Sequence, residues 1–565
     1  MSPGRKRRLK IESARAALSL LLVLVTFLIH YRFFEVQRLD QPIDYWGDAL
    51  FSAGFVKACE QGSYTPFLMK NVWTHGAPGV ASWDDFPVPE QLPMCAVGWL
   101  ARVVGLFRAI NLAYLGAMLV AALALYAVMR ALRVRWPIAV LLSAVYGISP
   151  YAVGRTVHHF NLIFYWHLPF VVLTCVWLAS RAGITWRSRK FQVAIATAVT
   201  VGLHNPYYLN FALQLVVLAG LAGHLRRGRA PGRGLKTMFA MLCVTVGTAL
   251  LVNAHVLVNV ARNGANPHVA SRTASDLERF ALKPIELLLP HQPHVFEPFQ
   301  KNAERYDRQQ RILQSERSYL GLIGALALLA TLVAATLGAM KKQSSLPADL
   351  GLSTAWLLLY ASPAGLNAVT GLVGFTLFRA TNRASIVIMT LALIAGGRML
   401  SAAARRVKTV WLLLALVAIA PLALWEQLFP RLTPAQVEQM HARADSDRVL
   451  MEQLQARVAK GSRIFQLPVV GYPEESFEPF RPFLHAEGLS FSFGAMRGRP
   501  EAEFQRRIAT LPPRAMVDEL SNSGFSAIWI QGDASGLFRA MSADFRVDLL
   551  TSPDGSSSVI LLPAR

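Results

Sequence analysis

The chain has 565 residues, of which 53% are hydrophobic and only 16% are charged, whereas soluble globular chains carry about 25% charged residues. Its apolar residues gather in blocks of about 20, the helix length that crosses a hydrocarbon core of about 30 Å, so a soluble protein is excluded. The net charge of +23 lies in short loops on alternate sides of these blocks, so it marks the cytoplasmic side and does not indicate a nucleic-acid partner.

The first 428 residues are predicted to form a polytopic α-helical membrane domain with about eleven transmembrane helices. Basic residues precede span one and follow spans two, four, six, eight and ten, so the N-terminus is expected in the cytoplasm and the C-terminus in the periplasm. Residues 362–381 are apolar but interrupted by proline and glycine, which favours a re-entrant segment. We expect the multi-pass protein in a bacterial cytoplasmic (inner) membrane, with spans at 16–34, 109–129, 137–151, 162–180, 191–202, about 209–226, 238–258, 320–340, 350–360, 385–400 and 410–428.

Two long loops, 35–107 and 259–318, are expected on the periplasmic side. Residues 429–565 have a different pattern, with β-like runs separated by helix-like stretches, which predicts a small periplasmic α/β domain. The sequence Ser552-Pro-Asp-Gly-Ser556 is a hairpin turn signal between two of these runs. Phe491, Phe493 and Arg497 of this domain are candidates to stack on acceptor sugars, although the domain is as compatible with a structural cap.

Two of the four cysteines, Cys59 and Cys95, lie in the first periplasmic loop. A disulfide between them is compatible with an oxidising compartment. The sequence contains no CxxC pair and no zinc-finger spacing. Cys175 and Cys243 fall within apolar blocks and are expected to be inert.

The first periplasmic loop carries acidic residues that are suited to proton transfer. Asp44 and Asp48 are four residues apart, which on a helix places both carboxylates on one face. Asp84 and Asp85 follow a glycine- and proline-rich stretch that is typical of a tightly folded loop. A carboxylate at the membrane surface can accept a proton from a sugar or lipid hydroxyl. The alternative is that these acids are solvated loop residues.

A second cluster of polar residues lies at the periplasmic end of span three. Arg155, His158 and His159 are expected close to the membrane surface. A guanidinium next to imidazoles is suited to a phosphate or diphosphate. Adjacent histidines do not share a helix face, so a zinc site is not indicated. Interfacial snorkelling is the alternative explanation.

Two further segments place polar or aromatic residues at the periplasmic side. His204 and Tyr207 lie between spans five and six, where aromatic residues usually form the interfacial belt but can also contact a sugar or lipid headgroup. Arg379 and Arg383 precede span ten and depart from the positive-inside pattern. Charges near hydrocarbon are costly, so these arginines are candidates to bind a lipid phosphate.

Signatures of other enzyme classes are absent from the sequence. There is no Walker A, HExxH or GxSxG pattern, so neither ATP hydrolysis nor a serine hydrolase is indicated. His291 and His294 are a lone histidine pair, which is weak evidence for a metal site. No cofactor is indicated with certainty, and a divalent metal stays an open alternative.

The architecture and several loop motifs resemble the GT-C superfamily of integral membrane glycosyltransferases. The resemblance rests on a long first periplasmic loop with acids soon after span one, as Asp44 and Asp48 are here, and on a periplasmic C-terminal domain. The pieces Gly47-Asp-Ala49, Arg155-Thr-Val-His-His159 and Arg379-Ala-Thr-Asn-Arg383 are similar to those of bacterial members. No Trp-Trp-Asp signature of the eukaryotic protein-modifying members is present.

The resemblance implies an inverting sugar transfer on the periplasmic face from a polyprenyl-phosphate-linked donor to an envelope glycan or lipid acceptor. The catalytic base then maps to Asp48 first, and to Asp44 or Asp85 next. Arginines and histidines would stabilise the departing lipid phosphate, a role that maps to Arg155 and Arg383, with Arg379 and His159 as further candidates. The partners expected are this donor, the acceptor and membrane lipids. A lipid transporter and a non-catalytic assembly scaffold are the alternatives.

Overall fold

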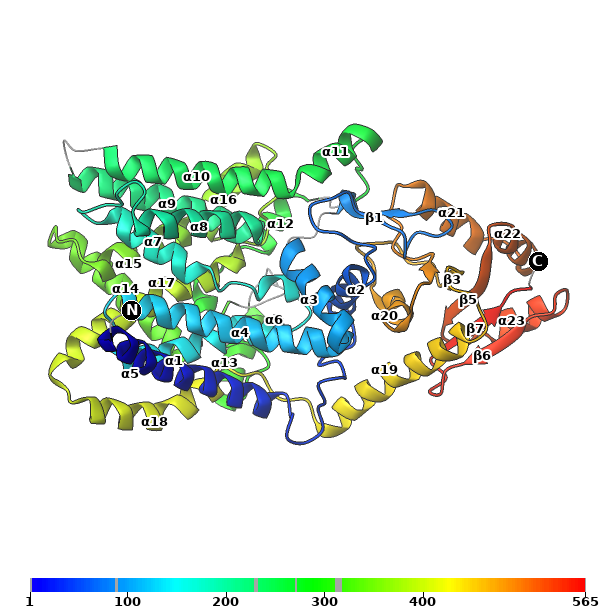
Figure 1. Ribbon diagram of the computed structural model, residues 1–565, viewed down its shortest axis with the longest axis horizontal. Helices are drawn as coiled ribbons and strands as arrows, with labels where there is room; N and C mark the ends of the chain where they lie inside the picture. The colour runs from blue at the N-terminus through cyan, green and yellow to red at the C-terminus, as the bar shows by residue number, and fades with distance from the viewer. Residues whose placement is uncertain (1–2, 87–89, 228–231, 270–271, 310–317, 564–565) are drawn as a thin grey trace.

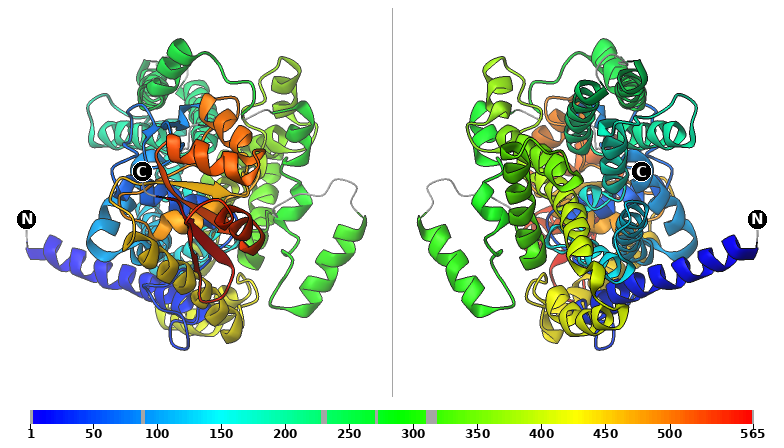
Figure 2. Two further views of the ribbon diagram at one scale, coloured as in Figure 1. Left: turned by 90° about the vertical axis from the view of Figure 1, so that its right-hand side faces the viewer. Right: turned by 90° about the vertical axis from the view of Figure 1, so that its left-hand side faces the viewer.

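The computed structural model describes residues 3–86, 90–227, 232–269, 272–309 and 318–563. The molecule is elongated, with a helical body at one end and an α/β domain at the other, and the loops that join them lie between the two (Figure 1). Two end views show the α/β domain seated on one end of the body, while the N-terminal part of α1 projects sideways (Figure 2). This confirms the predicted fold class of a multi-pass helical protein with a C-terminal α/β domain.

Nine of the predicted spans each overlap one α-helix of the body, and the spans predicted at 137–151 and 238–258 each overlap two consecutive helices. Seven segments of the described chain are long and apolar enough to cross a membrane, while several other helices are shorter, so the count of eleven stays a prediction. The helices are α1 (Pro3–His30), α4 (Leu106–Ala131), α5 (Trp136–Gly147), α6 (Pro150–Arg155), α7 (Leu168–Ala179), α8 (Arg189–Leu203), α9 (Pro206–Arg227), α10 (Gly232–Val252), α14 (Gly321–Met340), α15 (Leu346–Ala361), α17 (Ala384–Ala403) and α18 (Thr409–Trp425).

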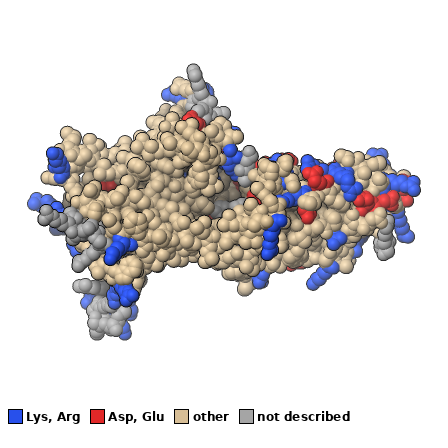
Figure 3. Space-filling view, turned by 90° about the horizontal axis from the view of Figure 1, so that it is seen from above, with Lys and Arg blue, Asp and Glu red and all other residues tan. Residues whose placement is uncertain are grey.

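Small residues allow these helices to approach closely. A Cβ atom on Gly202 of α8 would lie 2.6 Å from Thr248 of α10, and one on Gly351 of α15 would lie 2.4 Å from the carbonyl of Thr331 in α14. Close backbone approach at small residues is typical of membrane helix packing. On the face seen in Figure 3, the middle of the body carries few charged side chains. Lys and Arg lie mainly at the far end of the body and on the half of the molecule that contains the C-terminal domain.

The first long loop, 35–107, lies between the body and the α/β domain (Figure 1). It contains α2 (Asp48–Glu60), β1 (Asn71–Val72), β2 (Ala81–Ser82), η1 (Trp83–Asp85) and α3 (Gln91–Val104). A disulfide between Cys59 and Cys95 joins α2 to α3. Because α2 begins at Asp48, Asp44 lies outside the helix, and the prediction that both acids share one helix face is wrong.

The second long loop contains α11 (Ala254–Asn263), α12 (Ala274–Arg279), η3 (Pro284–Leu287) and α13 (Glu297–Gln309). Residues 362–381, predicted as re-entrant, contain only the short helix α16 (Leu366–Leu372), followed by η4 (Thr381–Arg383) at the start of α17. Helix α16 packs against α12, since a Cβ atom on Gly371 would lie 2.2 Å from Leu277. The second long loop and residues 362–381 therefore pack against each other.

The C-terminal domain is a five-stranded mixed sheet with the order β4-β3-β5-β7-β6. Strand β3 pairs in parallel with β4 and β5, β5 is antiparallel to β7, and β6 and β7 form a hairpin around the predicted turn. Its elements are α19 (Pro434–Gln455), β3 (Arg463–Leu467), η6 (Glu478–Phe480), α20 (Arg481–His485), β4 (Ser490–Phe491), α21 (Pro500–Ala509), α22 (Pro513–Asn522), β5 (Phe525–Gln531), α23 (Ser535–Ser542), β6 (Asp548–Thr551) and β7 (Ser557–Leu561).

The domain packs tightly on the first long loop. Phe491 and Phe493 are 0% and 3% exposed in this contact, and Trp83 donates its indole N–H to the carbonyl of Gly494 at 2.9 Å. Arg497 is ion-paired with Glu474. The expectation that these phenylalanines stack on sugars is therefore wrong, because both rings are buried in the core.

Candidate active site

Two neighbouring acids of the first loop face two neighbouring histidines. The Oδ2 atom of Asp44 lies 2.7 Å from Nε2 of His158, and the Oδ2 atom of Asp48 lies 3.6 Å from Nε2 of His159. Gly47 separates the acids and has a φ of +54°, a conformation that favours glycine. This turn points the two carboxylates at successive histidines.

Asp48 opens onto a cavity of about 580 Å³ between the body and the C-terminal domain. The cavity is lined by residues from four separate segments of the chain. Asp48, the first choice as base, and Arg379, a predicted phosphate ligand, thus come from positions more than 300 residues apart to one cavity. The lining residues are Gly47, Asp48, Arg272, Asp276, Arg379, Pro473, Glu474, Glu475, Ser476 and Phe477.

The surroundings of Asp48 suit a proton acceptor. Its side chain is 46% exposed toward the cavity. Partial burial raises the pKa of Asp48 above its usual value, against the opposing effect of His158. Burial, followed by the charges of Arg155 and Arg383, holds the pKa of His159 well below its usual range. A neutral His159 beside a carboxylate of raised pKa leaves Asp48 more basic than a solvated aspartate.

Four arginines lie near the Asp48–His159 pair: Arg155, Arg272, Arg379 and Arg383. Arg155 is 4% exposed and lies near His159 and Arg383. The guanidinium of Arg383 lies 4.1 Å from the centroid of the Tyr207 ring, and that of Arg379 lies 5.0 Å from the ring of Phe280.

Carboxylates compete for two of these arginines. Nη1 of Arg379 lies 3.9 Å from Asp276, and Nη1 of Arg272 lies 3.3 Å from Glu474. Within the described residues, Arg383 has no such carboxylate partner. The cavity therefore brings cationic groups together with Asp48, and such groups can stabilise an anionic leaving group.

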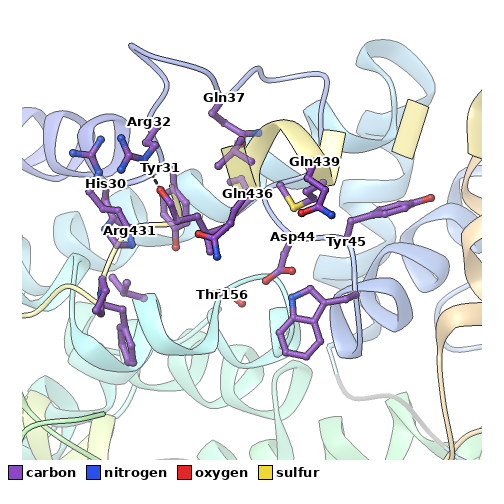
Figure 4. A pocket seen from close by; sticks show the side chains of 18 of the residues that line it. His30, Tyr31, Arg32, Gln37, Asp44, Tyr45, Thr156, Arg431, Gln436 and Gln439 are labelled. Carbon is purple, nitrogen blue, oxygen red and sulfur yellow. Dashed lines mark hydrogen bonds between the residues drawn. The ribbon is translucent and has the colours of Figure 1, made fainter. Parts of the chain in front are cut away.

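A second cavity, of about 710 Å³, lies on the other side of the Asp44–Asp48 segment (Figure 4). Asp44, Trp46 and Thr156 line it together with the end of α1 and the start of α19. The Trp46 side chain is 62% exposed and its ring meets His158 edge-on at 4.6 Å. Amide groups of Gln436 and Gln439 face the same space. The Asp44–Asp48 segment thus forms a wall shared by two cavities.

Three residues singled out from the sequence do not line the cavity that holds Asp48. Asp85 accepts two hydrogen bonds of 2.7 Å from Arg499, so this candidate base is held in an ion pair away from the cavity that Asp48 lines. Asp84 is fully buried against His255 and the backbone N–H of Lys70. The Nδ1 atom of His204 lies 2.8 Å from the carbonyl of Thr200.

Arg272, Asp276 and the pair Glu474–Glu475 line the cavity but were not found from the sequence. The acidic pair lies in the C-terminal domain, and no local pattern indicates that it would face the first loop. An available signal was Arg272, which is an arginine in a loop predicted to be periplasmic, like Arg379 and Arg383.

Among the described residues, no group of three or more His, Cys, Asp and Glu is arranged to hold a metal ion. The rings of His291 and His294 are 4.8 Å apart, but Nε2 of His294 lies 2.9 Å from the carbonyl of Glu426. The histidine pair is thus built into the contact between the second loop and the end of α18.

No protein-family profile matches the chain, and no curated protein sequence matches it. Among solved structures, arabinofuranosyltransferase AftD from Mycobacteria aligns with 98% of the chain at 14% identity and a TM-score of 0.45, and the chain covers 40% of AftD. ArnT from Cupriavidus metallidurans aligns in the apo state over 96% of the chain and 98% of ArnT, at 12% identity and a TM-score of 0.41. ArnT bound to undecaprenyl phosphate aligns over 97% and 99%, at 14% identity and a TM-score of 0.41. At such scores the functional argument depends on the geometry of the site.

Proposed function

We propose that this protein is a membrane glycosyltransferase that moves a sugar from a polyprenyl-phosphate donor to an envelope glycan or lipid acceptor on the periplasmic face. The observation that carries the proposal is that Asp48 and Arg379 line one cavity between the helical body and the C-terminal domain. A proton acceptor and a cation beside it are the two groups that such a transfer needs.

In the proposed reaction, Asp48 accepts the proton of an acceptor hydroxyl. The hydroxyl oxygen then attacks the anomeric carbon of the donor sugar, and the bond from that carbon to the lipid phosphate breaks with inversion. Arg379 and Arg383 stabilise the negative charge on the departing phosphate. His159 orients the Asp48 carboxylate from a distance of 3.6 Å, and Arg155 supports this arrangement from behind His159.

An exposed apolar surface next to the arginines favours a lipid-linked donor. Leu372 and Val373 are 85% and 82% exposed, and Phe375 and Leu377 are 46% and 59% exposed. These side chains immediately precede Arg379 in the chain. A polyprenyl chain that covers these four side chains would itself stay in an apolar environment. Its phosphate would then lie at the arginines.

The experiment expresses the wild type, Asp48→Asn and the control Asp518→Asn in a deletion strain and compares the cell-envelope glycans by mass spectrometry. Asp518 is an exposed acid of α22, outside the cavity. Loss of a positioned base lowers the rate about 10²–10⁴-fold, so Asp48→Asn should fail to restore the glycan at equal membrane level, whereas Asp518→Asn should restore it.

Full restoration by Asp48→Asn would show that Asp48 is not the base and would direct the same test to Asp44. A glycan profile that does not differ between the deletion strain and the wild type would contradict the transferase and favour the transporter or the scaffold.

A further inference from the structure

The largest of the described cavities lies at the opposite end of the helical body from the candidate active site. It has a volume of about 1010 Å³ and is a groove between the ends of α7 and α9 on one side and α15 on the other. The loop that joins α14 to α15 closes one end. The positive-inside pattern assigns this end of the body to the cytoplasm.

The end of the groove at the α14–α15 loop is cationic. Arg181 and Lys342 line it and are exposed, and neither has a carboxylate within ion-pairing distance among the residues that the structure describes. Arg226 is neutralised, because its two terminal nitrogens lie 2.8 and 2.6 Å from the oxygens of Asp349. The groove therefore offers two uncompensated positive charges.

The rest of the groove is apolar. Leu352, Trp356 and Leu359 line it from α15 at a spacing that places them on one helix face, and both leucines are 55% exposed. Leu218 and Ala222 line it from α9. From Asp349 to Leu359 the helix rises about 15 Å, which is about half of a hydrocarbon core of 30 Å.

Among the residues that the structure describes, α9 and α15 are joined at the far side of this groove by hydrogen bonds and at its near end by the Arg226–Asp349 pair. Trp356 donates to Gln214 at 2.9 Å, and Asn210 donates to Tyr360 at 2.8 Å. Between these contacts and the ion pair the helices leave a gap. A ligand in the gap would thus connect α9 to α15.

We propose that the groove binds one anionic phospholipid of the cytoplasmic leaflet. Its phosphate lies between Arg181 and Lys342, and one acyl chain lies against the apolar face of α15. The charges match an anionic headgroup, and the depth of the apolar part matches one leaflet. A free phosphate would leave the apolar wall uncovered.

The position of α15 links this site to the periplasmic side. Its last residue, Ala361, accepts a hydrogen bond of 2.7 Å from Thr381, which lies between Arg379 and Arg383. A lipid that holds α15 against α9 therefore also steadies the segment that carries those two arginines. This consequence is separate from the binding itself, which does not depend on the proposed transferase activity.

The test uses the full-length protein in mixed micelles of phosphatidylcholine and phosphatidylglycerol, and native mass spectrometry counts the phosphatidylglycerol retained. The double variant Arg181→Gln/Lys342→Gln removes both charges, and Arg405→Gln/Arg406→Gln is the matched control on the same end of the body. Each cation near a membrane surface is worth about fivefold in affinity, so the first variant should bind about 25-fold more weakly. The control should bind as the wild type does.

A second variant, Ala222→Phe, fills the groove and keeps its charges. It should also lose retained phosphatidylglycerol, and inorganic phosphate should not displace the lipid from the wild type. Equal retention by the wild type and the Arg181/Lys342 variant would overturn the proposal. Wild-type retention by Ala222→Phe, or displacement by inorganic phosphate, would overturn it as well, because either result would mean that only the headgroup is bound.

Discussion

Replacing Asp85 with asparagine is expected to weaken the attachment of the C-terminal domain to the first long loop. The Asp85 carboxylate is 2% exposed and Arg499 is 16% exposed, and two hydrogen bonds of 2.7 Å join them. The amides of Asn259 and Asn266 each add a bond of 2.9 Å. Removing one partner of a buried ion pair costs about 3–5 kcal/mol.

We expect the free energy of unfolding to fall by an amount near the lower end of this range, about 3 kcal/mol. The reason is that Arg499 keeps some contact with water and asparagine retains one acceptor oxygen. Limited proteolysis and thermal unfolding in detergent measure the effect. Arg499→Gln should cause a similar loss, and the double variant should add little, because both changes remove the same interaction. Arg507→Gln is the matched control, since it breaks an exposed pair with Glu519 and should change stability by less than about 1 kcal/mol.

The same ion pair predicts a dependence on pH. Burial alone would raise the pKa of Asp85, but the hydrogen bonds and charge of Arg499, together with the two amides, bring it below its usual value. A lowered pKa stabilises the fold above the unfolded value of about 3.9, and the stabilisation is lost as pH falls through the folded value. The contribution of this ion pair to stability should therefore be constant near neutral pH and should decrease once the pH is lowered past about 4.

Two results would refute this reasoning. If Arg499→Gln left the stability unchanged, the ion pair would not hold the domain in place. If Asp85→Asn abolished sugar transfer without any loss of stability, while Arg499→Gln kept the activity, Asp85 would be the base, as the sequence alone allowed.

Three further outcomes are expected. Glu474→Gln removes the carboxylate that faces two arginines near the cavity, so undecaprenyl phosphate should bind about two- to fivefold more tightly; unchanged binding would contradict this competition. Replacing Cys59 and Cys95 with serine opens a 36-residue loop and should cost about 3–4 kcal/mol, and an unchanged melting temperature would argue against it. Gly54→Ala places a methyl group 2.7 Å from an aromatic carbon of the C-terminal domain and should cost about 1–3 kcal/mol. The control Gly116→Ala meets nothing within 4 Å and should melt as the wild type does.

The sequence predicted the helices and strands well, because hydropathy, basic loops and turn residues are local signals. The pattern at 552–556, for example, does form the turn between β6 and β7. Asp48 and Arg379 were both found as isolated charges at the periplasmic side, although only the tertiary structure brings them to one cavity.

One incorrect prediction concerns a local turn. Asp44 and Asp48 were predicted to share one helix face, but the helix begins only at Asp48, after the positive φ of Gly47. The contacts that the sequence did not indicate join distant segments. The ion pair of Asp85, a candidate base, could not be foreseen because Arg499 lies 414 residues away. Glu474 was missed for the same reason, because nothing near it in the sequence indicates that its loop lies over the first long loop.

The segment Pro473–Phe477 forms part of the wall of the cavity that holds Asp48, and this has a consequence for how the protein is made. Ribosomes add about 5–20 residues per second, and roughly 90 residues separate Arg383 from Pro473, so the wall is synthesised about 5–20 s after the last arginine of the site. Until the C-terminal domain has been made and has folded, the cavity lacks that wall. The cavity is therefore expected to be complete only after this interval, so the order of synthesis itself delays its assembly.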